Sequence, residues 1–167
     1  MWIKYPALPI LFWMLALLQA SFFSSLHVFG AVPNLVFILL FCLIFFSDQR
    51  FWEDTMWAVV AGFFLDVYSS FYFGISIIAL LIVCYIERYF LSLLSRLSEK
   101  FPLVYFVPLF IICLVGYDLV LFGISCLTGT CWWSISGKIF YIPEIILNII
   151  FALGFYLVFR KLNKNEV

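Results

Sequence analysis

Long apolar runs alternate with short polar segments along the whole chain. The runs cover residues 6–26, 32–46, 56–68, 72–86, 102–126 and 139–159. A helix that crosses a bilayer needs roughly 20 apolar residues. The pattern therefore predicts six membrane-spanning helices. The second and third runs are short for a full crossing, and we expect tilt in a locally thin bilayer or buried irregular backbone at their ends.

The polar positions predict how these helices are oriented. Six crossings place both termini on the same side, and eight of the nine basic residues then fall on that side while Lys138 falls on the other. Cytoplasmic segments of membrane proteins are enriched in Lys and Arg, so we expect both termini in the cytoplasm. The first run is longer than a signal-peptide core and lacks a small-x-small cleavage site, which favours a retained helix.

Composition agrees with this pattern. The chain is 67% hydrophobic and 11% charged, and its mean hydropathy is +1.21. These values predict an all-α, polytopic membrane protein in which one integral membrane domain fills residues 1–167. The largest polar gap, residues 87–101, predicts a short amphipathic helix on the membrane surface. With a net charge of zero, the chain carries no footprint for nucleic-acid binding.

The sequence holds none of the common catalytic or metal-binding patterns. It has one histidine, His27, and no CxxC, HExxH, nucleophile-elbow or phosphate-loop motif. Asp66 and Asp118 on facing helices would in principle make an intramembrane acid–base pair, but no paired motif surrounds these residues. We therefore expect no enzyme activity, no metal and no cofactor.

Two of the five cysteines differ from the others in position. Cys126 and Cys131 fall five residues apart in the predicted outer loop. An oxidising outer compartment would allow them to form a disulfide, although spacing alone leaves the geometry open. The other three lie inside apolar runs, where a thiol packs as a small hydrophobic group.

Three carboxylates interrupt the apolar runs, and the topology places all of them in the outer half of the membrane. They are Asp66, Asp118 and Glu144, and Asn148 lies one helical turn from Glu144 on the same face. A charge at the bilayer centre costs roughly 3 kcal/mol, so each acid needs a reason. Three interpretations stay open for this cluster: interhelical hydrogen bonds, a partner-binding site, and a small-ligand pocket.

A small-residue face is predicted on the third helix. Ala58, Gly62 and Asp66 recur at four-residue spacing and therefore share one side of the helix. Small side chains let a second membrane helix approach closely, so we expect a helix-packing contact there.

Several of these residues also form a motif that resembles the rod-shape-determining MreD family. The matching positions are Pro33, Asn34, Gly62, Asp66 and Gly74. They fall in Val32-Pro33-Asn34-Leu35, at the start of the second run, and in Gly62-x-x-x-Asp66, which closes the third before a small-residue turn and Gly74. Pro143-Glu144-x-x-x-Asn148 and the basic tail are also similar to the family's last span. Asn34 replaces the commoner Asp.

The resemblance implies a non-enzymatic inner-membrane scaffold of the cell-elongation machinery, which builds peptidoglycan and sets rod shape. It implies binding to MreC, and association with MreB, with RodA and with a penicillin-binding transpeptidase. The membrane lipid is the remaining partner. Which face meets MreC is not indicated by the sequence.

An alternative function stays open at this point. The substrate-binding subunits of energy-coupling-factor vitamin transporters also have six spans, similar length and a pocket that opens outward. The Asp66, Asp118 and Glu144 placement suits such a pocket, and on this alternative we expect the two families to share an overall architecture. Against it, the outer loops carry few polar groups that would bind a ligand.

Overall fold

The computed structural model describes residues 4–23, 31–46, 51–69, 73–98, 102–127 and 142–164. Six α-helices account for most of them, which confirms the all-α prediction. They are α1 (Lys4–Leu18), α3 (Leu35–Phe46), α4 (Phe51–Tyr68), α5 (Ile75–Ser98), α6 (Pro102–Leu127) and α8 (Ile142–Lys164). A π-helical turn, η1 (Gln19–Phe23), continues α1.

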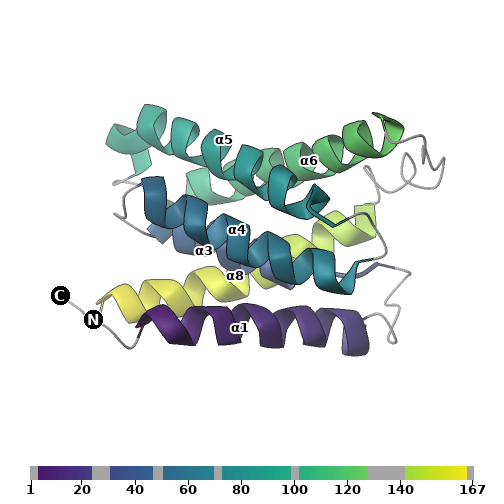
Figure 1. Cartoon of the computed structure of the whole chain (residues 1–167). Helices are drawn as coiled ribbons and strands as arrows, with labels where there is room; N and C mark the ends of the chain where they lie inside the picture. The colour runs from purple at the N-terminus through teal and green to yellow at the C-terminus, as the bar shows by residue number, and fades with distance from the viewer. Residues whose placement is uncertain are drawn as a thin grey trace.

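Successive helices run in opposite directions along one bundle axis (Figure 1). As a result α1 begins and α8 ends at the same end of the bundle, which we call the terminal end. We call the opposite end the capped end, because side chains there cap the starts of α3 and α5. An even number of alternating helices produces this placement, as the count of apolar runs predicts.

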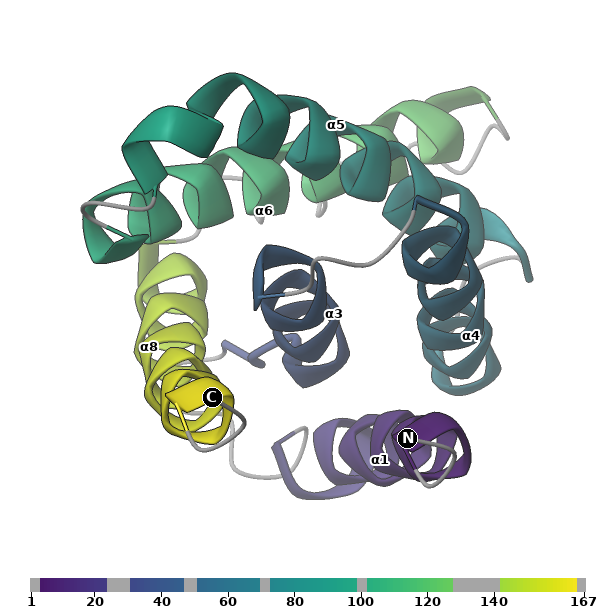
Figure 2. The ribbon, with the colours of Figure 1, turned by 90° about the vertical axis from the view of Figure 1, so that its left-hand side faces the viewer.

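Helix α3 lies in the centre of the bundle, with the other helices arranged around it (Figure 2). Every residue from Leu35 to Cys42 is buried. Aromatic rings fill the space between α3 and α6: the Phe41 ring lies 5.1 Å from that of Phe110 and 5.3 Å from that of Phe106. The twelve residues of α3 rise only about 18 Å along the helix axis. Protein surrounds this short helix. A continuous apolar sequence is what such an enclosed helix needs.

Within the described residues, three helices are long and apolar enough to cross a bilayer by length and composition. The qualifying segments are Ile75–Leu93 of α5, Leu103–Leu127 of α6 and Ile142–Leu162 of α8. The segments Ala7–Phe23 and Leu35–Phe46 are apolar but shorter. The chain thus has several apolar helices of the kind that membrane proteins contain, and six complete crossings remain a prediction.

Helices α4 and α5 extend well beyond the apolar runs that predicted them. Helix α4 begins at Phe51 rather than near residue 56, and α5 continues without a break to Ser98. The prediction of a separate surface helix over residues 87–101 is therefore wrong. Glu87 and Arg88 looked like the end of a span, yet Glu87 is fully buried and Arg88 pairs with a residue of α4.

Trp57 lies at the edge of the third apolar run, where tryptophan commonly anchors a helix at the membrane surface. The residue is instead buried, and its ring lies 6.4 Å from that of Phe12 on α1. The earlier start of α4 explains this, because Trp57 falls in the second turn of the helix rather than at its beginning. Trp52 is the exposed tryptophan of this helix.

Candidate functional site

Asn34 caps the first turn of the central helix. Its side-chain Oδ1 accepts a hydrogen bond from the Phe37 N–H at 3.1 Å, and its carbonyl accepts the first helical bond, from the Ile38 N–H, at 3.0 Å. A helix begins with N–H groups that lack partners within the helix, and Asn is among the residues that satisfy them best. The motif position after Pro33 is therefore an N-cap of α3.

Two other elements complete this helix start. The side-chain Oδ1 of Asn148, on α8, accepts the Asn34 N–H at 2.8 Å. Gln19, in η1, accepts the Leu35 N–H through Oε1 at 3.1 Å. The Asn148 amide also donates to the Glu144 carbonyl at 2.9 Å, which fixes its orientation. One helix end thus ties α3 to α8 and to the end of the first helix.

Asp66 performs the corresponding task for α5, although it belongs to α4. Its Oδ2 accepts the Gly74 N–H at 2.8 Å, and its Oδ1 accepts the Ser76 N–H at 2.9 Å. The Gly74 carbonyl accepts the first helical bond, from Ile78, so Gly74 occupies the N-cap position. A glycine has no side chain to cap with, and the Asp66 carboxylate supplies the missing acceptor. The positive end of the helix dipole favours an anion at this place.

Two glycines make this arrangement sterically feasible. Gly74 has a φ of 100°, a conformation that other residues adopt only with strain. Gly62 lies one turn before Asp66, where a Cβ would come within 2.5 Å of the Ile77 Cα and 2.8 Å of its backbone nitrogen. Ala58, one turn earlier, is also buried. The small-residue face of α4 therefore packs directly on the backbone of α5.

Asp118 and Glu144 lie near the same end of the bundle but have a different setting. Both are half-buried, and they are close enough to interact electrostatically. The preceding residue, Tyr117, is buried and lies within hydrogen-bonding reach of the Ser76 and Asn34 side chains. Tyr117 therefore lies close to the starts of both α3 and α5, a position that the sequence pattern did not indicate.

These contacts define the capped end as a structural polar network built by Asn34, Asp66 and Asn148 with their backbone partners. Their side-chain oxygens accept backbone N–H groups at the starts of α3 and α5. No group of three metal-ligating side chains occurs within the described ranges. His27, Lys138 and Cys131 lie outside the described residues, so the Cys126–Cys131 disulfide stays a prediction.

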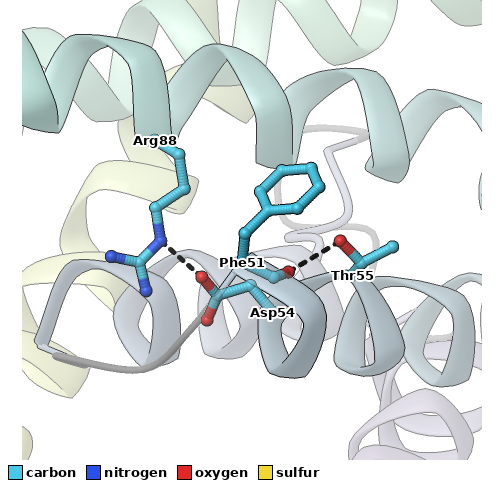
Figure 3. Close-up of polar contacts among 4 residues, drawn as sticks. All are labelled: Phe51, Asp54, Thr55 and Arg88. Carbon is cyan, nitrogen blue, oxygen red and sulfur yellow. Dashed lines mark hydrogen bonds and ion pairs between the residues drawn. The ribbon is translucent and has the colours of Figure 1, made fainter.

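A second polar cluster, near the terminal end, was not identified from the sequence. The Arg88 Nε on α5 donates to the Asp54 carboxylate on α4, and Asp54 is almost fully buried (Figure 3). In the same view the Thr55 hydroxyl bonds the Phe51 carbonyl at 2.8 Å, within α4. Glu87, beside Arg88, is fully buried. The sequence does contain a signal for this pair, because Asp54 comes just before the third apolar run and Arg88 just after the fourth.

Comparison with known proteins gives one match. A family model described as rod shape-determining protein MreD matches residues 3–165. Neither a curated protein nor a solved structure matches the chain. The predicted likeness in architecture to the substrate-binding subunits of energy-coupling-factor transporters therefore has no structural comparison behind it.

Proposed function

Because the chain belongs to the rod shape-determining MreD family, we propose that it works as a membrane scaffold of the cell-elongation machinery. The family consists of non-enzymatic, multi-pass membrane proteins that determine cell shape. The proposal adds a mode of action, in which the bundle holds other components of the machinery together through its helix faces and loops.

The family match over residues 3–165 is the observation that carries this proposal. The use of the polar motif residues supports it. Asn34, Asp66 and Asn148 are occupied in holding helix ends. Such a network stabilises a fixed bundle, and a fixed bundle is what a scaffold has to present to its partners.

The proposed partners follow from the family. MreC is the direct partner, and MreB, RodA and a penicillin-binding transpeptidase are the further components of the same assembly. Many large apolar side chains are exposed on the outer helices, including Trp13 and Met14 on α1 and Phe63 on α4. In a bilayer these surfaces contact lipid or the membrane helix of a partner.

We further propose that the protein lies in the bacterial inner membrane with both termini in the cytoplasm. The exposed residues Arg160 and Lys161 lie near the terminal end of α8, and basic residues favour the cytoplasmic side. Alkaline phosphatase and green fluorescent protein can be fused after the last residue and inserted within residues 128–141. Fluorescence from the first position and phosphatase activity from the second are expected, and the reverse pattern would contradict the orientation.

The binding proposal is tested by co-expressing the chain with MreC and purifying the pair through a tag on MreC. Co-elution in a fixed ratio through size-exclusion chromatography is expected. A Gly116→Ala variant should co-elute with MreC equally well, because a Cβ at Gly116 meets no atom within 4 Å. Elution of the two proteins as separate, folded species would contradict direct binding.

The transporter alternative is not proposed. Asp66 suited an outward-facing ligand pocket when only the sequence was considered. In the structure its two oxygens accept backbone N–H groups of the α5 start. The family match also covers nearly the whole chain.

A further inference from the structure

Glu87 is a carboxylic acid inside the bundle. It lies on α5, its exposed fraction is 0%, and neither of its side-chain oxygens has a hydrogen-bond partner among the residues that the structure describes. Native proteins pair nearly all buried polar atoms, and an exception calls for a physical explanation. An ionised carboxylate without partners in an apolar interior is so costly that such a group takes up a proton instead.

Helices α3, α4 and α6 pack on α5 and, together with α5 itself, supply the groups around Glu87. The thiols within electrostatic range of its carboxyl are Cys42 of α3, Cys84 of α5 and Cys113 of α6, and all three are buried. The charged groups within range are Asp54 of α4 and Arg88 of α5. This neighbourhood therefore contains one cation and a second acid.

Arg88 is directed to the second acid. Its Nε donates to the Asp54 carboxylate, and this ion pair links α5 to α4 (Figure 3). Adjacent residues of a helix point in different directions. Arg88 lies within electrostatic range of Glu87, but neither carboxyl oxygen of Glu87 has a hydrogen-bond partner among the described residues. The guanidinium that pairs with Asp54 is thus the cation nearest to both acids.

We propose that Glu87 is a neutral acid in the packed bundle, and that its ionisation loosens α5 from α3, α4 and α6 near the terminal end. Asp54, Glu87 and Arg88 would then form a proton-dependent latch. The proton is exchanged with water and no other reactant is needed. A charged Glu87 has to draw water between the helices, because the thiols beside it are only weak donors and the Arg88 guanidinium is engaged by Asp54.

The buried thiols provide a direct readout of this loosening. In a background that carries Cys126→Ala and Cys131→Ala, the remaining cysteines are Cys42, Cys84 and Cys113. The full chain is reconstituted in lipid nanodiscs, and its reaction with a water-soluble maleimide is followed between about pH 6 and pH 9. Higher pH accelerates the thiol chemistry itself, so each rate is divided by the rate for Glu87→Gln at the same pH.

Glu87→Gln keeps the shape of a neutral acid and removes the ionisation. The maleimide reaction rate with Glu87 intact, divided by the rate with Glu87→Gln, should lie near one at low pH. It should then rise with pH, by up to about tenfold per unit where opening requires the loss of one proton. Glu53→Gln removes a half-buried acid from the first turn of α4 and should behave like the protein with Glu53 and Glu87 intact.

A ratio that stays constant over the whole range overturns the proposal. Glu87→Met is the second variant, since it has similar length and no side-chain oxygen, and the same low, pH-insensitive opening is expected. If Glu87→Gln and Glu87→Met both fail to fold while the parent folds, the bundle requires the anion. That result would also overturn the proposal.

Discussion

Replacing Asp66 with leucine should weaken the junction between α4 and α5. The substitution removes two hydrogen bonds, from the N–H groups of Gly74 and Ser76, and leaves the start of α5 without its cap. Asp66 is almost fully buried, so water replaces these bonds poorly. We therefore expect Asp66→Leu to lower folding stability and weaken helix packing. We do not expect it to abolish a reaction, because no reaction depends on this carboxylate.

The size of the loss can be bounded. Interhelical hydrogen bonds in membrane proteins average about 0.6 kcal/mol each, so two bonds give a lower bound of about 1 kcal/mol. Hydrogen bonds to a charged group contribute about 1.5–3 kcal/mol each, which gives an upper bound of about 6 kcal/mol. Asp66→Asn retains one carbonyl oxygen as an acceptor, and we expect it to lose roughly half as much as Asp66→Leu.

The assay is unfolding of the purified chain in mixed detergent micelles, followed by circular dichroism. Asp118→Leu is the control, since it removes an acid that is only half-buried and caps neither α3 nor α5. The expected order of stability places Asp66→Leu lowest, Asp66→Asn next, and Asp118→Leu at or above the parent protein. An Asp66→Leu variant as stable as the parent would refute the capping argument.

Two other substitutions test the contacts between α4 and α5. Gly62→Ala places a Cβ against the α5 backbone, and overpacking of this kind costs about 1–3 kcal/mol. Gly116→Ala adds a Cβ in open space, and its melting temperature should equal or exceed that of the parent because Ala favours a helix over Gly. Equal melting temperatures for both variants would show that the helices separate easily at Gly62. Arg88→Met leaves the buried Asp54 without its ion-pair partner and should lower stability by about 3–5 kcal/mol. Adding Asp54→Asn to Arg88→Met should recover part of the loss, and a double variant less stable than Arg88→Met alone would contradict the pairing.

The helices were predictable because their signal is local. Each apolar run is continuous over many residues, and even the central position of α3 is consistent with a sequence that lacks any polar face. The continuation of α5 was not predictable in this way. Glu87 and Arg88 are polar, and the residue that accepts Arg88, Asp54, lies 34 positions away. A single sequence does not show that pairing.

The sequence indicated several of the residues that form the capped end, but not the hydrogen bonds that they make there. Spacing predicted that Asp66 would lie at the outer end of its helix, near a small-residue face. It did not predict that the carboxylate would cap the next helix, because that depends on the turn made by Gly74. The contribution of Gln19 was missed for a similar reason, since it joins α3 from a π-helical turn.

The scaffold proposal is tested most directly by purifying the tagged chain from its own host in mild detergent and identifying the bound proteins by mass spectrometry. The account predicts recovery of MreC together with wall-synthesis proteins, and a reduced yield of these proteins with Asp66→Leu but not with Gly116→Ala. Recovery of paired ATPases with a large transmembrane coupling subunit, and no MreC, would contradict it.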